Sequence, residues 1–320
     1  MASNYSIGKV LHYAIQAAEY GGRQVKHVVD SGSLETTFKE RQVDPVTVGD
    51  MRAHQVMTGI LKQALPDVTV ISEEDDTEKL VEIVDPSEYQ NVPPPAEQFL
   101  KMSGQGELDP KSITIWIDPL DATQEYTQKL YEFVQVMVGI AVNGRPVGGV
   151  LHRPLLDTPV TYWAWKGVAL SPELRDLPRK KNDVLKIVMS RTASHAGDVK
   201  GFSETAFGSK KFELVPAGGA GYKLLQVILG KADAYLHITK IKKWDLCAGH
   251  GVLNALGGNL TSLTGEEMDY RPPADTKQDV LVHDGFVAAV NDFDWFLKGC
   301  QKAHSAQKNQ VNQRSVLSFS

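Results

Sequence analysis

The sequence predicts a layered protein of the α/β or α+β class, in which helices and β-sheets are interleaved. Segments with apolar residues three and four positions apart alternate with short β-rich runs along most of the 320 residues. The composition, 42% hydrophobic and 23% charged, is that of an ordinary globular protein. The length exceeds that of one typical hydrophobic core, so we expect two domains or one large layered one.

The first half of the chain is expected to form two long helices and a sheet. The helices are predicted at 6–30 and 48–65, and Pro66 ends the second. Strands are predicted at 68–71, 112–118, 134–142, 146–151 and 161–164. Asn143-Gly144 is a strong hairpin signal between two of them. Residues 76–111 are polar and irregular, and we interpret them as a long surface excursion whose role the sequence leaves open.

The second half alternates strands and helices after a proline-containing segment at 170–183, which we interpret as a linker. Strands are predicted at 184–190, 211–215, 232–238, 259–263 and 279–283, and helices at 196–206, 222–229, 245–256 and 291–302. We therefore expect an N-terminal subdomain at 1–170 and a C-terminal subdomain at 184–303. Residues 304–320 are polar, and we expect them to be disordered.

Charge and composition exclude several classes of protein. The net charge is −5 and the pI about 6.0, which argues against binding to a nucleic-acid backbone. No apolar run is long enough to span a bilayer, and the N-terminus lacks the pattern of a signal peptide, so the chain as printed is expected in the cytoplasm. Two cysteines are too few for a disulfide framework or a zinc site.

The most informative segment is the acidic turn that contains Asp118 and Asp121. Asp118 ends an apolar strand, Pro119 prevents the strand from continuing, and Asp121 and Thr123 follow at once. Ligands of α/β proteins usually bind at the carboxyl ends of strands. Two carboxylates that converge there repel each other, and a divalent cation relieves the repulsion. Oxygen ligands favour magnesium, manganese or calcium over zinc.

Each acidic residue also has an ordinary structural interpretation. Asp118, Asp121 and Asp245 could each cap a helix, and Glu73-Glu74 could belong to a solvated loop. These two glutamates directly follow a short apolar strand, however, and Asp50 lies at another predicted junction. Four acidic clusters at four junctions favour a metal site over a set of unrelated caps.

The three strongest clusters match a known family. Glu73-Glu74, the run from Asp118 to Thr123, and Trp244-Asp245 resemble the lithium-sensitive, magnesium-dependent phosphatase superfamily of inositol monophosphatase, over about residues 6–300. Finer features, WIDPLDATQEYT at 116–127, PAGGAGYK at 216–223 and KKWDLCA at 242–248, resemble a branch that acts on nucleotide bisphosphates. The resemblance implies a layered αβαβα sandwich of the α+β class, the fold of inositol monophosphatases and sugar phosphatases.

The resemblance also implies a set of metal ligands. Glu73, Asp118 and the backbone carbonyl of Leu120 would hold one Mg²⁺ ion. Asp118, Asp121 and Asp245 would hold a second. Two ions that bridge the reacting phosphate stabilise the attacking and leaving oxygens of an in-line displacement.

Further roles follow from the same resemblance. Asp50 and Glu73 would contact a weaker third ion, which makes two or three Mg²⁺ ions per site. Thr123, paired with Asp50, would orient and deprotonate the attacking water. A threonine hydroxyl is a weak base, so the proton must pass on to a carboxylate. Glu74 is expected to contact the metal ligands rather than the metal ion itself.

Substrate contacts are expected from the second half of the chain. The residues that the resemblance places there are Ser190, Ser194, His195, Gly219, Ala220, Lys223 and His237. Backbone N–H groups at the glycine-rich turn could hold phosphate or ribose oxygens, although a glycine turn without a ligand is the simpler interpretation. Lys240, Lys242 and Lys243 could recognise a second phosphate or could be solvated.

The expected activity is removal of the 3′-phosphate of 3′-phosphoadenosine 5′-phosphate to give AMP. An inositol monophosphatase and a catalytically inactive protein that binds a phosphate ligand are the alternatives. The partner is thus expected to be a small phosphate ester rather than a nucleic acid. We expect no membrane span in this chain, and a monomer or homodimer. The Golgi lumen is the alternative compartment if an N-terminal anchor has been removed.

Overall fold

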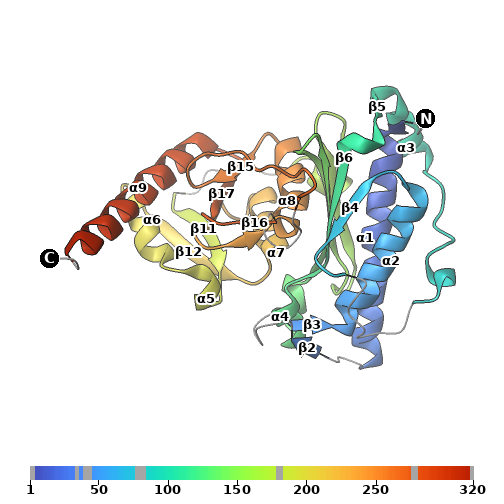
Figure 1. The fold of residues 1–320 in the computed structure, drawn as a ribbon, viewed down its shortest axis with the longest axis horizontal. Helices are drawn as coiled ribbons and strands as arrows, with labels where there is room; N and C mark the ends of the chain where they lie inside the picture. Colours follow the sequence, from blue (N-terminus) through green and yellow to red (C-terminus); the bar gives the residue numbers. More distant parts are fainter. Residues whose placement is uncertain are drawn as a thin grey trace.

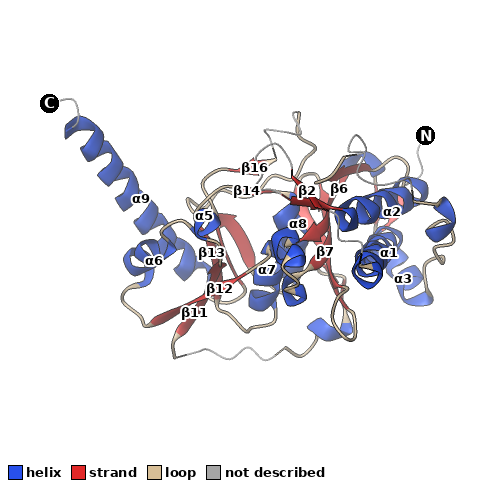
Figure 2. Ribbon diagram, turned by 90° about the horizontal axis from the view of Figure 1, so that it is seen from below, coloured by secondary structure: helices blue, strands red, loops and turns tan. Residues whose placement is uncertain are grey.

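The computed structural model describes residues 4–32, 36–38, 45–75, 84–177, 183–274 and 280–317. Two β-sheets and their helices stack in five layers (Figure 1). Helices α1 (Ile7–Ser31) and α2 (Val48–Ala64) cover one face of a six-stranded sheet, and α7 (Ala220–Ile228) and α8 (Trp244–Ala255) cover the other. A five-stranded sheet follows, with further helices on its far side (Figure 2). The layers confirm the predicted α+β sandwich.

Three hydrophobic cores lie between these layers. One joins α1 and α2 to the first sheet, and Val10, Met57 and Ile115 are among its residues. The second fills the space around α7 and α8 between the two sheets. The third lies beneath the outer helices, where Phe202 and Phe296 are almost fully buried. Continuous apolar packing through all five layers fixes the position of one sheet relative to the other.

The first sheet has the strand order β10-β9-β8-β7-β6-β4 and is antiparallel except where β4 runs parallel to β6. Its strands are β4 (Thr69–Ser72), β6 (Ile113–Asp121), β7 (Gln135–Val142), β8 (Arg145–Arg153), β9 (Val160–Trp165) and β10 (Ala169–Leu170). Asn143 and Gly144, with φ angles of 51° and 77°, form the predicted hairpin turn.

The second sheet has the order β12-β11-β13-β17-β15, with β11 parallel to both of its neighbours. Its strands are β11 (Leu185–Ser190), β12 (Phe212–Ala217), β13 (Ala234–His237), β15 (Asn259–Ser262) and β17 (Phe286–Ala289). Three short pairs complete the strands: β1 (Tyr5–Ser6) with β5 (Glu107–Leu108), β2 (Thr36–Phe38) with β3 (Pro45–Thr47), and β14 (Ile241–Lys242) with β16 (Leu281–Val282).

The remaining helices lie at the edges of the layers and in the connections. They are α3 (Glu97–Lys101), α4 (Thr123–Thr127), α5 (Ala193–Ala196), α6 (Val199–Phe207) and α9 (Phe293–Leu317). Short 3₁₀ turns occur at Pro86–Glu88, Met102–Gln105, Pro110–Ser112, Tyr131–Phe133 and Pro172–Leu174. No helix in these described ranges is long and apolar enough to cross a membrane.

Four segments differ from the sequence prediction or lie partly outside the described ranges. The strand predicted at 279–283 is described as β16 at 281–282, and β17 at 286–289 was not predicted. The expected disordered tail at 304–320 continues α9 as far as Leu317, because no proline or glycine interrupts the helix there. The expected excursion at 76–111 is described from 84 onward and packs on α1, where His12 Nε2 lies 2.8 Å from the carbonyl oxygen of Pro93. The expected linker at 170–183 is described up to 177, and Leu174 within it is buried.

Candidate metal and active site

The acidic turn leaves the first sheet through an irregular strand end. The register between β6 and β7 shifts between Asp118 and Asp121, where Pro119 interrupts the regular ladder. The backbone N–H of Leu120 donates to Oδ1 of Asp118 over 3.1 Å, and Ala122 adopts a left-handed φ of 71°. The chain thus bends sharply and turns into α4, which begins at Thr123.

Three of the predicted metal ligands converge on one point. Carboxylate oxygens of Glu73, Asp118 and Asp245 all lie within 4.8 Å of one another. They come from the end of β4, from β6 and from the first turn of α8. Asp118 is 1% exposed. Its burial and the charges of Glu73, Asp121 and Asp245 raise the pKa of Asp118 well above its ordinary value.

Asp121 lies outside this group of three and faces the start of α7. Its Oδ1 accepts the N–H of Ala220 over 3.0 Å and its Oδ2 accepts the N–H of Gly221 over 2.8 Å. Burial raises the pKa of Asp121 to about 6, although the Lys223 ammonium and these two N–H groups lower it. The turn that was expected to bind substrate through free N–H groups thus uses two of them to hold a carboxylate.

Thr123 and Asp50 meet as the resemblance implied, although 73 positions separate them. Thr123 Oγ1 lies 3.2 Å from Oδ1 of Asp50 and 3.0 Å from the carbonyl oxygen of Leu120. The other oxygen of Asp50 accepts hydrogen bonds from the N–H and hydroxyl of Thr47, which closes a capping box at the start of α2. Asp50 therefore belongs to the capping box of α2 and is also a partner of Thr123.

The donor set fits a hard divalent cation. Glu73, Asp118 and Asp245 offer oxygen atoms, and Glu73 also pairs with Lys242. Burial and the Glu73 charge raise the pKa of Asp245 as well, so the site as folded gathers more negative charge than it neutralises. Mg²⁺ prefers carboxylate, carbonyl and water oxygens, and its charge would remove this cost.

The predicted substrate residues fall into two groups by exposure. Ser194 and His195 on α5 are exposed, whereas Ser190 at the end of β11 and Lys223 on α7 are buried. The Lys223 ammonium donates to the carbonyl oxygens of Ala217 over 3.4 Å and Gly219 over 2.5 Å. Burial lowers the pKa of Lys223 to about 8, against the opposing effect of nearby carboxylates.

His237 is buried at the end of β13 in the second sheet rather than lying on an open surface. Its ring stacks on Phe286 with centroids 5.6 Å apart, and its Nε2 is 3.2 Å from the carbonyl oxygen of Lys240 and 3.0 Å from Oγ1 of Thr239. Burial lowers the pKa of His237 to about 4. A substrate contact by His237 stays a prediction. Its visible role is to hold the 237–240 turn, whose Thr239 hydroxyl donates to the carbonyl of His195.

Three residues near the site were not predicted from the sequence. Glu125 on α4 is buried and pairs with Arg191, whose Nη1 lies 3.3 Å from Oε1 of Glu125. Gln135 lies opposite Asp121 in the sheet and is fully buried, and its side-chain amide makes no hydrogen bond to the rest of the described chain. Arg191 could have been found from the sequence, because it directly follows Ser190 at the end of a predicted strand. Ligands of α/β proteins usually bind at the carboxyl ends of strands.

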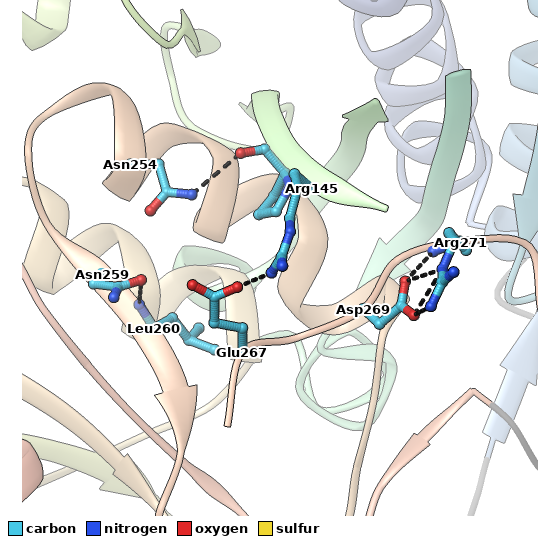
Figure 3. Close-up of polar contacts among 8 residues, drawn as sticks. Arg145, Asn254, Asn259, Leu260, Glu267, Asp269 and Arg271 are labelled. Carbon is cyan, nitrogen blue, oxygen red and sulfur yellow. Dashed lines mark hydrogen bonds and ion pairs between the residues drawn. The ribbon is translucent and has the colours of Figure 1, made fainter. Parts of the chain in front are cut away.

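A separate cavity of about 1020 Å³ lies at the other end of α8. Arg145, Glu267 and Asn254 are among the residues that line it. Figure 3 shows the ion pair between Arg145 and Glu267 and the hydrogen bond from Asn254 to the carbonyl of Pro146. Asp245 lies in the first turn of α8 and Asn254 near its end, so about 14 Å of helix separates these two residues, and none of Glu73, Asp118, Asp121 and Asp245 lines the cavity. The cavity therefore does not belong to the metal site.

The chain as a whole is similar to one known family. A model of the inositol monophosphatase family matches residues 7–305. The chain belongs to the inositol monophosphatase family. Inositol monophosphatase 3 of Danio rerio is 40% identical over 272 residues, which cover 82% of this chain and 76% of that protein. The Golgi-resident adenosine 3′,5′-bisphosphate 3′-phosphatase of Rattus norvegicus is also 40% identical over 272 residues, covering 82% of this chain and 73% of that protein.

A solved structure of this family shares the fold. A structure described as an IMPase/NADP phosphatase complexed with Mg²⁺ and phosphate aligns with a TM-score of 0.59 and 17% identity, over 87% of this chain and 90% of that one. The predicted family and fold class are thus confirmed. As a member of the inositol monophosphatase family, the protein is a metal-dependent phosphatase that hydrolyses phosphoric monoesters.

Proposed function

We propose that this inositol monophosphatase family member removes the 3′-phosphate of 3′-phosphoadenosine 5′-phosphate to give AMP and phosphate. The observation that supports a phosphatase site is the convergence of Glu73, Asp118 and Asp245 within 4.8 Å. The nucleotide substrate is supported by the name of the rat relative and by the 40% identity to it.

The metal ligands of this proposal are the carboxylates already described. Glu73, Asp118 and the Leu120 carbonyl would hold one Mg²⁺ ion, and Asp118, Asp121 and Asp245 a second, with Asp50 and Glu73 available to a weaker third. Bound magnesium supplies charge neutralisation for the transferring phosphoryl group and lowers the pKa of water.

Thr123 and Asp50 would handle the proton of the attacking water. With its hydroxyl hydrogen directed at Oδ1 of Asp50, 3.2 Å away, the Thr123 oxygen keeps lone pairs that can accept a hydrogen bond from water. The water proton would pass to Thr123 Oγ1 as the hydroxyl proton passes to Asp50. The Thr47 contacts to the other Asp50 oxygen keep the carboxylate in place for this step.

An inositol monophosphatase is the second candidate, because the zebrafish relative of equal identity carries that name. Phosphate release from 3′-phosphoadenosine 5′-phosphate and from inositol 1-phosphate, each with and without Mg²⁺ and Li⁺, separates the two. We expect faster release from the nucleotide, none without Mg²⁺, and inhibition by Li⁺. Faster release from inositol 1-phosphate, or indifference to Li⁺, would contradict the proposal.

A binding protein without activity would release no phosphate from either substrate. An Asp118→Asn variant, purified in the same way, controls for a contaminating phosphatase. It lacks a ligand shared by both proposed ions, so its residual release sets the background.

A further inference from the structure

Arg191 stands at the junction between the second sheet and the metal site. It follows Ser190, the last residue of β11, and its backbone N–H donates to the carbonyl of Ala217 over 3.1 Å. Ala217 ends β12 and leads into the glycine-rich turn that holds Asp121. The backbone of Arg191 is therefore fixed beside the turn at the carboxyl ends of the parallel strands β11 and β12. Ligands usually bind at this end of parallel strands.

The guanidinium of Arg191 reaches across to α4, the helix that begins with Thr123. Its Nη1 lies 3.3 Å from Oε1 of Glu125 and 3.3 Å from Oε1 of Gln128. Glu125 is buried against the same turn, since a Cβ atom placed on Gly218 would lie 2.5 Å from its Cδ. Glu125 thus holds one edge of the guanidinium next to Thr123 and the turn.

The rest of the guanidinium remains available to a ligand. The Arg191 side chain is 38% exposed, and within the described ranges only Nη1 donates a hydrogen bond. The unused Nε and Nη2 groups form the fork that binds a phosphate through two parallel hydrogen bonds. Lys223 differs in this respect, because its ammonium is buried and donates to the carbonyls of Ala217 and Gly219.

We propose that Arg191 binds a second phosphate group of the substrate, remote from the phosphate that is hydrolysed. The site would then select nucleotide bisphosphates over monophosphates, because only the former have an anion within reach of the guanidinium. This inference rests on the proposed phosphatase function and specifies how that site chooses its substrate.

The test compares two substrates that differ only in the remote phosphate, 3′-phosphoadenosine 5′-phosphate and 3′-AMP. The readout is the ratio of their kcat/KM values in the Mg²⁺-loaded enzyme. We expect the wild type to prefer the bisphosphate, and Arg191→Gln to reduce this preference at least about tenfold through a higher KM, since a charge-assisted contact is lost. Arg191→Lys keeps the charge without the fork and should fall between the two.

Glu125→Gln distinguishes phosphate recognition from simple positioning. It removes the charge of the ion pair, but the glutamine oxygen can still accept the hydrogen bond from Nη1 and keep the guanidinium in place. Both substrates should therefore slow together, and their ratio should persist. Arg145→Gln removes an exposed arginine at the far cavity and should leave both rates unchanged (Figure 3). A calorimetric comparison of AMP with adenosine adds a measurement independent of turnover, in which Arg191→Gln should weaken the binding of AMP alone.

Several results would overturn the inference. One is a wild-type enzyme that does not prefer the bisphosphate. Another is an Arg191→Gln variant that slows equally on both substrates, and a third is an Arg191→Gln variant that binds AMP as tightly as the wild type. Release of phosphate from inositol 1-phosphate but from neither nucleotide would instead reject the proposed function, and this inference with it.

Discussion

The ammonium nitrogen of Lys242 lies 2.9 Å from Oε1 of Glu73, a member of the carboxylate cluster. The backbone N–H of the same lysine donates to Oδ2 of Asp245 over 3.2 Å, so one residue contacts two candidate metal ligands. The lysine side chain is 31% exposed and the glutamate side chain 15%. An ammonium in this position neutralises part of the charge that a divalent cation would otherwise neutralise.

Removing the Lys242 charge should therefore strengthen metal binding. We expect Lys242→Gln to lower the Kd for Mg²⁺ about fivefold, because a positive charge within a few ångströms opposes a cation even when partly screened. Isothermal calorimetry of Mg²⁺ binding measures this without substrate. Lys243→Gln removes the neighbouring charge and is the matched control. Equal or weaker Mg²⁺ binding by Lys242→Gln would show that the lysine does not oppose the cation.

Asp121 should be essential for turnover but not for folding. We expect Asp121→Asn to reduce kcat at least about 100-fold, since it removes a proposed ligand. The asparagine oxygen can still accept the hydrogen bond from the Ala220 N–H. The variant also avoids burying an ionised carboxylate, a cost that raises the pKa of Asp121 to about 6 in the wild type. The free energy of unfolding without Mg²⁺ should therefore stay within about 1 kcal/mol of wild type.

Urea denaturation and phosphate release measure both effects of Asp121→Asn. Asp269→Asn alters a carboxylate that is paired with Arg271 away from the site, and it should leave turnover intact (Figure 3). Unchanged turnover in Asp121→Asn would mean that the second ion is not where we propose.

Gly149 on β8 allows α8 to approach the first sheet closely. A Cβ atom there would clash with the backbone of Ala248 on α8. We expect Gly149→Ala to destabilise the protein by about 3 kcal/mol, since overpacking against backbone forces a shift of the helix that carries Asp245. Gly104, which has nothing within 4 Å of its added Cβ, is the matched control, and Gly104→Ala should be nearly neutral. Similar midpoints of urea unfolding for both variants would refute this account of the packing.

His152 should make folding stability depend on pH. Its Nδ1 lies 3.0 Å from Oγ1 of Thr161, and burial lowers the pKa of His152 to about 4. The unfolded chain binds a proton near pH 6.5 and the folded protein resists it, so this contribution is present above pH 6.5 and is lost as the pH falls toward 4. Between pH 7.5 and 5.0 the loss from this group should be about 2 kcal/mol.

An asparagine can imitate Nδ1 of the histidine but does not titrate. His152→Asn should be less stable than wild type at pH 7.5, yet it should lose about 2 kcal/mol less on acidification to pH 5.0. Urea titrations at both pH values give the comparison. His27→Asn, at an exposed position of α1, should keep the wild-type dependence on pH. Parallel losses in His152→Asn and wild type would exclude His152 as the source.

Much of the fold follows from local patterns that the sequence displays directly. The long helices α1 and α2 follow from apolar spacing and from the capping residues Ser6 and Thr47. The β7–β8 hairpin follows from Asn143-Gly144. Helix α9 continues to Leu317, beyond the predicted end at 302, because its polar C-terminal part contains no proline or glycine that would break the helix.

The sequence by itself indicated most of the order of helices and strands, the family and the acidic residues that could bind a metal, because periodicity, turn chemistry and short motifs are properties of neighbouring residues. Only the tertiary structure decided which residues from distant parts of the chain contact one another. Lys242 contacts Glu73 across 169 positions and Arg191 contacts Glu125 across 66, and no local pattern encodes either pair. His237 likewise became an interior residue only when β13 packed beside Phe286. Such contacts depend on how the two sheets pack about α7 and α8, which is set by the cores between the layers.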